Sequence, residues 1–352
     1  MVGADRGSKV ALALIAGILV CAALSVADKL VVPLAFAFLI IAVAWPLQYA
    51  LRKVLPNLVA VTITLLVTLV VVGSVSAAVV WGFGMVAQWV IANTTRFQAL
   101  YAEASTWLEG HGFVMAGLFT EHFDVRWALR MLQGLSGRVQ GLTSFLIITL
   151  VYVLLGLLEV DAFKSQVARL ERQDIAAYLL RTGSDIATKF QKYMVVRTFM
   201  SIGTGMVVWA FTLAAGLELA TAWGAIAFAM NYIPFIGPFI ATFLPTAFAL
   251  VQFESWEMAA LVFVCLNIIQ FLSGSYLEPR IAGKAVAISP TMVLFSVFFW
   301  AYLWGLAGAF IGVPIMIAAL TACANSKSAK WIADLLSGEP AGKQRPQPSR
   351  AA

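Results

Sequence analysis

EPRIAGKAVAISPTMVLFSVFFWAYLWGLAGAFIGVP, residues Glu278 to Pro314, is the stretch that decides the fold class of this chain. It begins with charged residues around a proline and then enters a run of 42 residues, Ala285 to Ser326, that carries no charge. As one helix this run would rise about 63 Å, but a membrane span needs only about 20 residues. We therefore expect the run to fold back on itself, at the glycines that follow Trp304.

A second uncharged run, Leu219 to Phe253, has the same design. Its middle reads Asn231-Tyr-Ile-Pro-Phe-Ile-Gly-Pro238. Pro234 and Pro238 lack a backbone donor and disfavour helix just before themselves, so this run should break there. Unwound backbone is tolerated at membrane depth only where protein buries it or where it lines a wet cavity. Two apolar runs interrupted by proline and glycine therefore indicate a transport site.

The composition points to the same class of protein. Hydrophobic residues make up 62% of the 352 residues and charged residues only 11%, against about 25% charged in an ordinary soluble domain. We expect an all-α polytopic membrane protein with about eight membrane helices, two of its elements being Pro/Gly-interrupted helical hairpins, and with the lipid bilayer as partner. The net charge of +6 is spread over the loops, which is typical of membrane proteins and does not indicate a nucleic-acid partner.

Apolar and polar stretches alternate along the chain. The two first apolar runs, Val10 to Ala27 and Leu30 to Leu51, are expected to form a helical hairpin. In order, we expect N-terminal membrane helices in 1–80, an extracytoplasmic amphipathic segment in 81–140, a membrane helix in 141–158, a cytoplasmic helical segment in 159–197, a C-terminal membrane region with the interrupted hairpins in 198–326, and a polar cytoplasmic tail, expected to be disordered, in 327–352.

The orientation follows from the loop charges. Segment 159–197 is the largest polar segment with a basic excess, so the positive-inside rule places it in the cytoplasm. Both termini then fall in the cytoplasm as well. An interrupted run enters and leaves on one side whether it is a re-entrant hairpin or two full spans, so both alternatives stay open and the orientation is the same.

The sequence contains no residue pattern typical of a catalytic or metal site. Cys21, Cys265 and Cys323 each lie alone in an apolar run, and His111 and His122 lack the spacing of a zinc protease. The spans contain no internal histidine and no acidic pair, and the chain has no glycine-rich phosphate loop ending in Gly-Lys-Ser/Thr. We expect no enzyme, no metal, no cofactor and no ATP-driven pump.

The expected transport site combines the two interruptions. Their broken backbones would meet near the membrane midplane and offer carbonyls and amides to a small molecule or an ion, with Asn231 adding a side-chain hydrogen bond. Polar amides in the span before Glu278 are either solute contacts or glue between helices. The transport-site candidates are Asn231, Pro234, Gly237, Pro238, Asn267, Gln270, Gly305, Gly308, Gly312 and Pro314.

Two charged residues follow the last uninterrupted span. Glu278 and Arg280 are candidates for a cytoplasmic gate, and in a proton-coupled protein Glu278 would be the titrating group. The alternative is a structural salt bridge at the membrane interface, because charges at span ends are usually paired or reach toward water.

Five short blocks carry a resemblance to a known family. They are Asn231–Pro238 as quoted above, Glu278-Pro-Arg-Ile-Ala-Gly-Lys284, Ile288-Ser-Pro290, Phe299-Trp-Ala-Tyr-Leu-Trp-Gly-Leu-Ala-Gly308 and Val313-Pro314. The chain resembles the autoinducer-2 exporter family, the PerM-like permeases of bacteria. The resemblance covers the chain from the first hairpin to Pro314, although the specific blocks lie in residues 231 to 314.

The resemblance implies a bacterial inner-membrane permease that moves a small organic solute such as autoinducer-2. It also implies about eight membrane helices, a homo-oligomer and mobile helical hairpins. Sodium or lithium/proton exchange, associated with other members of the family, is the alternative. A membrane scaffold or regulator acting through residues 159–197 is an alternative of another class, but a scaffold has no reason to place helix breakers inside two apolar runs.

Overall fold

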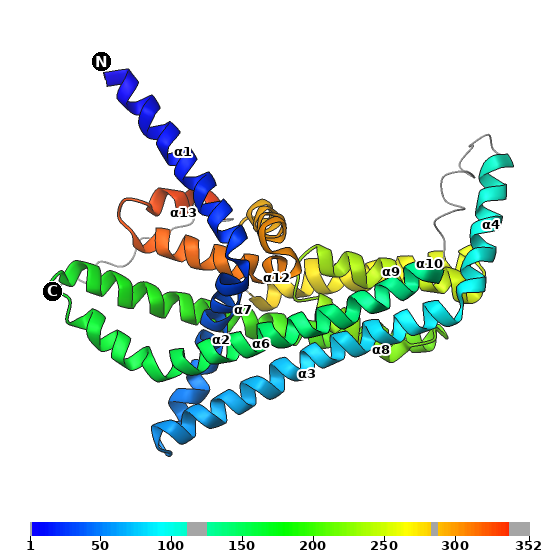
Figure 1. Ribbon diagram of the computed structural model, residues 1–352, viewed down its shortest axis with the longest axis horizontal. Helices are drawn as coiled ribbons and strands as arrows, with labels where there is room; N and C mark the ends of the chain where they lie inside the picture. Colours follow the sequence, from blue (N-terminus) through cyan, green and yellow to red (C-terminus); the bar gives the residue numbers. More distant parts are fainter. Residues whose placement is uncertain (1, 111–124, 283–287, 338–352) are drawn as a thin grey trace. The chain divides into compact units, whose positions relative to one another are not determined.

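A computed structural model describes residues 2–110, 125–282 and 288–337 (Figure 1). The regular elements of these residues are all helices, and no strand occurs among them. Eight of the described helices are long and apolar enough to cross a membrane. The prediction of an all-α polytopic membrane protein is therefore confirmed. The eight candidate spans are Gly7–Val26, Asp28–Leu51, Asn57–Ala92, Gly141–Ala168, Gln173–Ala214, Ile236–Phe253, Trp256–Leu277 and Pro290–Asn325.

The N-terminal helices are α1 (Val2–Val26), α2 (Asp28–Leu51), α3 (Asn57–Ala92) and α4 (Thr94–Gly110). Only Ala27 separates α1 from α2, and the two helices meet end to end at a bend (Figure 1). They do not form the hairpin that we expected, because an antiparallel turn between helices needs about two to five residues.

Three helices run through the segment boundaries that the polarity of the sequence suggested. α3 continues beyond residue 80, α6 (Val125–Ala168) passes residues 140 and 158, and α7 (Gln173–Ala214) passes residue 197. A helix satisfies its own backbone in water as well as in lipid, so a change of polarity does not require a change of backbone. The segment division itself stays a prediction, and His111 and His122 lie outside the described residues.

The chain forms two compact units. Unit 1 comprises Met1–Leu65, Ile148–Tyr193 and Lys284–Ala352, and includes α1, α2, α12 (Pro290–Asn325) and α13 (Lys330–Leu336). Part of its core is a small cluster of buried apolar side chains from α2, α3 and α6. The cluster consists of Ala37, Val61, Val153 and Leu157.

Unit 2 comprises Leu66–Ile147 and Met194–Gly283. Its core is aromatic: the Phe248 ring lies 4.0 Å from the Trp89 ring and 5.1 Å from the Trp223 ring, between centroids. Besides parts of α3, α6 and α7, it contains α4, α8 (Ala220–Met230), α9 (Ile236–Phe253), α10 (Trp256–Phe271), a π-helical turn η1 (Leu272–Leu277) and α11 (Glu278–Ala282).

The polar tail is partly ordered. Lys330–Leu336 forms α13 and packs on α12, and the backbone N–H of Ser289 donates to the carbonyl of Leu336 at 3.4 Å. We expected the whole of 327–352 to be disordered. Residues 338–352 lie outside the described part of the chain.

Candidate transport site

The uncharged run Leu219 to Phe253 breaks where its prolines predict. α8 has 11 residues and rises about 17 Å, so α8 alone cannot cross a hydrocarbon core of about 30 Å. Residues 231–235 then leave the helix before α9 begins at Ile236. This short first arm favours a re-entrant hairpin over two full spans.

The break contains a tight turn at Phe235. Phe235 has φ 63° and ψ −54°, and the N–H of Ile236 donates to the carbonyl of Pro234 at 2.7 Å. These are the features of the γ-turn with positive φ, which is the rarer and more strained of the two γ-turn forms. A side chain in this conformation costs of order 1–3 kcal/mol, and the surrounding structure has to hold it.

The two arms of this hairpin touch through backbone. A Cβ atom placed on Gly237 would lie 1.9 Å from the Met230 carbonyl oxygen, so only glycine fits at this position. Pro238 lies in the first turn of α9, where its missing donor is harmless. Pro234 lies in the break itself. Gly237 thus sets how closely the arms approach, while the prolines decide where helix is interrupted.

A row of polar side chains on α7 holds the break. Arg197, Thr198, Ser201 and Thr204 share one face of α7 because they are three or four residues apart or adjacent. We call these four residues the α7 polar stripe. Ser201 and Thr204 are at most 2% exposed, and Arg197 is also buried.

Two members of the α7 polar stripe bond to the break. The Asn231 amide Nδ2 donates to Ser201 Oγ at 3.2 Å, and the Tyr232 hydroxyl donates to Thr198 Oγ1 at 3.0 Å. A third member, Thr204, forms a hydrogen bond with Ser273 in η1. The stripe therefore joins the interrupted hairpin to the π-helical turn through side-chain hydrogen bonds.

The two amides of α10 have different environments. Asn267 is exposed, and its Nδ2 donates to the Phe263 carbonyl on its own helix at 2.8 Å. Gln270 is 8% exposed, and no partner of its Nε2 occurs among the described residues. Of the two, Gln270 is better placed to bind something polar inside unit 2, since a buried amide donor without a partner is costly.

Glu278 pairs with a residue of the α7 polar stripe. Arg197 Nη1 donates to both carboxylate oxygens of Glu278 at 2.7 Å, with side chains 7% and 25% exposed. Arg280 instead stacks its guanidinium over the Tyr276 ring at 4.0 Å. The expected gate pair is therefore divided, and whether Glu278 gates or couples transport stays a prediction.

The α7 polar stripe was not predicted as part of a site from the sequence. Arg197 is one of the basic residues of segment 159–197, and nothing local distinguishes it from its neighbours. The available signal was the helical spacing of polar residues through the start of an otherwise apolar stretch, which predicts a buried polar face. The π-helical turn η1 has no comparable signal, although π-helical turns occur often at functional sites.

In unit 1, α12 folds back on itself as expected. Trp304 (φ −130°, ψ 16°) and Gly305 (φ 62°, ψ −144°) leave the helical conformation, so residues 290–303 form a first arm and residues 306–325 a second arm. The break comprises Trp304 and Gly305, whereas the candidates Gly308, Gly312 and Pro314, which we expected to belong to it, lie in the helix of the second arm. Pro314 is buried and lies inside the helix of the second arm.

Glycines bring the arms of α12 together. A Cβ on Gly308 would lie 1.8 Å from the Trp300 carbonyl oxygen, and one on Gly312 would lie 2.8 Å from that of Ser296. Ser296 Oγ donates to the Gly312 carbonyl at 2.6 Å. Gly308 and Gly312 therefore pack within the hairpin, and Gly305 supplies its turn.

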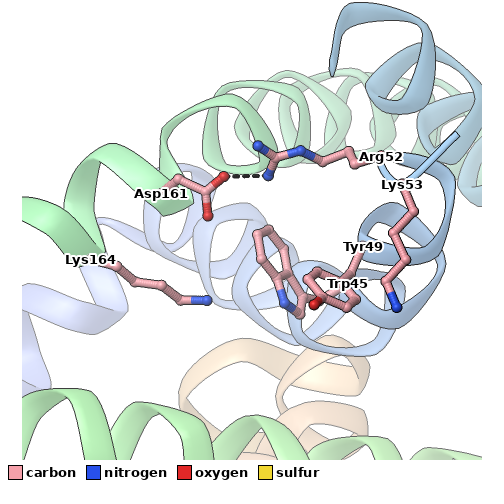
Figure 2. A pocket seen from close by; sticks show the side chains of 6 residues that line it. All are labelled: Trp45, Tyr49, Arg52, Lys53, Asp161 and Lys164. Carbon is pink, nitrogen blue, oxygen red and sulfur yellow. Dashed lines mark hydrogen bonds and ion pairs between the residues drawn. The ribbon is translucent and has the colours of Figure 1, made fainter. Parts of the chain in front are cut away.

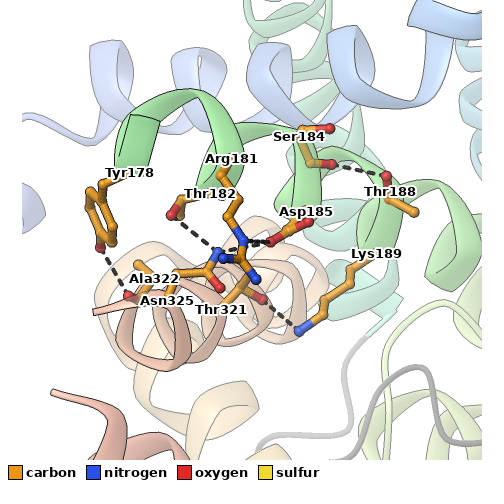
Figure 3. Close-up of polar contacts among 10 residues, drawn as sticks. All are labelled: Tyr178, Arg181, Thr182, Ser184, Asp185, Thr188, Lys189, Thr321, Ala322 and Asn325. Carbon is orange, nitrogen blue, oxygen red and sulfur yellow. Dashed lines mark hydrogen bonds and ion pairs between the residues drawn. The ribbon is translucent and has the colours of Figure 1, made fainter. Parts of the chain in front are cut away.

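The second arm of α12 is fastened to α7 by a row of hydrogen bonds (Figure 3). The Tyr178 hydroxyl donates to the Ala322 carbonyl at 2.9 Å, and Lys189 Nζ donates to Thr321 Oγ1 at 3.1 Å. The Asn325 amide donates to Asp185 at 2.8 Å and to Thr182 at 3.2 Å. We call this row the α12 seam.

The candidates fall into two groups according to their units. Asn231, Pro234, Gly237, Pro238, Asn267, Gln270, Glu278 and Arg280 belong to unit 2, and the four candidates of α12 belong to unit 1. The break of unit 2 and the α7 polar stripe form the candidate transport site of this protein. No cluster of metal-ligating side chains occurs in the part of the chain described.

Candidate spans, a proline-broken hairpin and buried polar contacts at the break define a polytopic helical membrane protein with an interrupted hairpin of the kind found in transporters. The chain belongs to the AI-2E transporter family, whose sequence pattern matches residues 11–327. The resemblance expected from the five sequence blocks is thereby confirmed.

Curated relatives are transport proteins of bacteria. The AI-2 transport protein TqsA of Escherichia coli K12 is 29% identical over 342 residues, which cover 94% of this chain and 96% of that protein. A putative transport protein of Borreliella burgdorferi is 29% identical over 178 residues, covering 50% and 49% of the two chains. The putative transport protein YhhT of E. coli K12 is 28% identical over 191 residues, covering 54% and 53%.

Proposed function

We propose that this protein is a permease that moves a small organic solute, similar to autoinducer-2, across the bacterial inner membrane. Membership in the AI-2E family favours transport over a scaffold role. The solute class rests on the similarity to the E. coli AI-2 transport protein, which extends over nearly the whole of both chains.

The observation that carries the proposal is the strained break of unit 2 and its side-chain bonds. Asn231 and Tyr232 reach the α7 polar stripe through neutral hydrogen bonds. Such a bond is worth about 1 kcal/mol net, so a solute with hydroxyl groups can replace it at little cost. The strain at Phe235 favours a change of the turn when that exchange occurs.

In this mechanism the hairpin of α8 and α9 is the moving part. Solute binding exchanges the bonds of Asn231 and Ser201 for bonds to the solute, and the arms shift about the turn at Phe235. Gln270 supplies a further buried amide donor for the solute. Asn267 is exposed on α10 and plays no part in this step.

The experiment is a flux assay on purified full-length protein reconstituted in vesicles. Radiolabelled autoinducer-2 should equilibrate across these membranes faster than across empty vesicles, and Gln270→Leu should slow the flux while leaving the protein folded. If folded wild-type protein moves neither autoinducer-2 nor other small polyhydroxylated solutes, the proposal is wrong.

A proton-sensitive dye in the same vesicles tests sodium or lithium/proton exchange. The proposed solute permease is expected to show no cation-dependent proton movement. Proton movement driven by sodium or lithium, and abolished in Glu278→Gln, would replace the solute permease by an antiporter.

We further propose a homo-oligomer in the inner membrane with both termini in the cytoplasm. The basic excess of residues 159–197 supports this orientation. Reporter fusions at residues 5 and 345 would both report cytoplasm, and a mass measurement of the detergent-solubilised protein would give the number of subunits.

A further inference from the structure

An open pocket lies in unit 1 at the end of α2. Its volume is about 350 Å³. It is lined by residues from two chain segments, the C-terminal end of α2 with the following loop and the C-terminal part of α6 (Figure 2). The lining residues are Trp45, Tyr49, Arg52, Lys53, Asp161 and Lys164.

The helical register explains why these side chains gather. Trp45, Tyr49 and Arg52 are four and three residues apart and share one face at the end of α2, and Asp161 and Lys164 are three apart on α6. Tryptophan and tyrosine are enriched where a span meets the headgroup region. A pocket with these two rings at the end of a candidate span is typical of the headgroup level.

The charges of the pocket are not balanced. Three cations line it against one carboxylate, and this carboxylate, Asp161, is paired with Arg52. Lys164 Nζ lies 4.3 Å from the centroid of the Trp45 ring, and Lys53 Nζ lies 4.8 Å from that of Tyr49. Figure 2 shows the two rings between the two lysines. Within the described residues, neither lysine forms an ion pair, so the pocket carries a net charge of +2.

We propose that this pocket binds the phosphate of an anionic phospholipid headgroup. An anion there would meet two ammonium groups that are already positioned by aromatic rings, and Arg52 presents further donors beside its bond to Asp161. Basic pockets between membrane helices commonly bind anionic headgroups.

A lipid fits this position better than a soluble phosphate. The same helices expose large apolar side chains, with Leu47 38% and Phe163 64% exposed. Apolar surface of this kind suits acyl chains, and free phosphate would gain nothing from it. The ligand class is therefore a phosphodiester attached to a hydrophobic tail, such as phosphatidylglycerol.

The test compares lipid binding to three forms of the full-length protein in detergent. These are the wild type, the double variant Lys53→Gln/Lys164→Gln, and the control Lys29→Gln/Lys330→Gln, which loses the same charge from exposed lysines elsewhere in unit 1. Titration with phosphatidylglycerol is followed by native mass spectrometry and by thermal unfolding. Phosphatidylcholine and inorganic phosphate are titrated in parallel.

We expect phosphatidylglycerol to bind the wild type and the control equally, and the double variant about tenfold or more weaker, because each basic residue near the headgroups contributes about 1 kcal/mol. Lys164→Arg should retain binding. Equal phosphatidylglycerol binding by the double variant, when its unfolding without lipid matches that of the control, would overturn the proposal. Binding of inorganic phosphate with no preference for phosphatidylglycerol would overturn the lipid assignment.

Discussion

The two interrupted hairpins, one in each unit, both reverse the chain direction within an apolar run, but their turns differ. Both bring their arms into backbone contact at a glycine, Gly237 in unit 2 and Gly308 in unit 1. The turn of α12 places a glycine, Gly305, at positive φ, whereas the break between α8 and α9 places Phe235 there. One turn is relaxed, and the other keeps a side chain in a strained conformation.

The two hairpins also differ in how they are fastened. The second arm of α12 is joined to α7 by the α12 seam (Figure 3). Its α12 residues, Thr321, Ala322 and Asn325, lie 16 or more positions beyond Gly305 at the turn. The α8–α9 hairpin is held at the break itself, by Ser201 and Thr198 of the α7 polar stripe. This difference supports the proposal that the hairpin of unit 2 moves during transport, while α12 keeps its place on α7.

The largest loss of stability is expected from variants that place a Cβ atom where the two arms of a hairpin touch. Gly308→Ala places a Cβ 1.8 Å from a carbonyl oxygen, and Gly237→Ala places one 1.9 Å away, so the arms must separate in both variants. We expect each to lose more than about 3 kcal/mol of stability, since overpacking against backbone cannot relax as a flexible side chain does. Thermal unfolding in detergent, followed by tryptophan fluorescence, measures this loss.

Gly203→Ala is the control for these variants. Gly203 lies inside α7, with nothing within 4 Å of its hypothetical Cβ. Alanine should be neutral or should stabilise by up to about 1 kcal/mol there, since it is the better helix former. If Gly308→Ala or Gly237→Ala unfolded at the temperature of Gly203→Ala, the arms would not be as close as described.

The next largest loss of stability is expected from breaking a buried ion pair. The ion pair near the hairpin of unit 2 is largely buried, whereas the one near α12 is exposed. Arg197→Gln leaves the carboxylate of Glu278 without its buried partner and should cost about 3 kcal/mol of stability. The control is the exposed pair of Arg181 with Asp185 of the α12 seam, at 3.9 Å, and Arg181→Gln should cost less than about 0.5 kcal/mol.

A double-mutant cycle separates the pair from its surroundings. Arg197→Gln combined with Glu278→Gln should be less destabilised than Arg197→Gln alone, because the orphaned carboxylate is removed as well. Additive losses in chemical-denaturation midpoints would show that the two residues do not act as a pair.

Substituting the residue at positive φ in each turn tests whether the two turns differ in backbone strain. Gly305→Ala should cost about 2 kcal/mol, because φ 62° with ψ −144° is accessible to glycine almost alone. Phe235→Gly should instead stabilise by about 1 kcal/mol by relieving positive φ, and it should alter solute flux because the turn loses its strain.

Phe235→Ala removes the same ring but keeps a Cβ, and so controls for loss of the aromatic side chain. It should be less stable than Phe235→Gly in the same unfolding measurement. Equal stability of the two variants would mean that no strain is stored at this turn.

The sequence predicted the two interruptions closely because their causes are local. Pro234 and Pro238 remove donors wherever they stand, and a run of 42 uncharged residues cannot cross a membrane once without excess length. The width of the second break could not be predicted, because Gly308 and Gly312 remain helical and pack between the arms of α12, and the second arm stays helical through the buried Pro314.

The partners of the break could not be read from the sequence. Asn231 reaches Ser201 across 30 positions of the chain, and Glu278 reaches Arg197 across 81. Such pairs depend on which faces of α7 and its neighbours come together after packing, and periodicity indicates a face without naming its partner. Gln270 was predicted with Asn267, but only the fold separates the buried amide from the exposed one.

The smallest loss of stability is expected from removing single neutral hydrogen bonds, and these variants should differ in solute flux although they are equally stable. Ser201→Ala removes the acceptor of the Asn231 amide, and Tyr178→Phe removes a donor of similar strength from the α12 seam. Each should lose about 1 kcal/mol of stability, the net worth of one neutral hydrogen bond. Only Ser201→Ala should change flux of the solute, because its bond lies at the hairpin proposed to move. Equal flux changes in the two variants, at equal stability, would assign movement to both hairpins and remove the distinction between them.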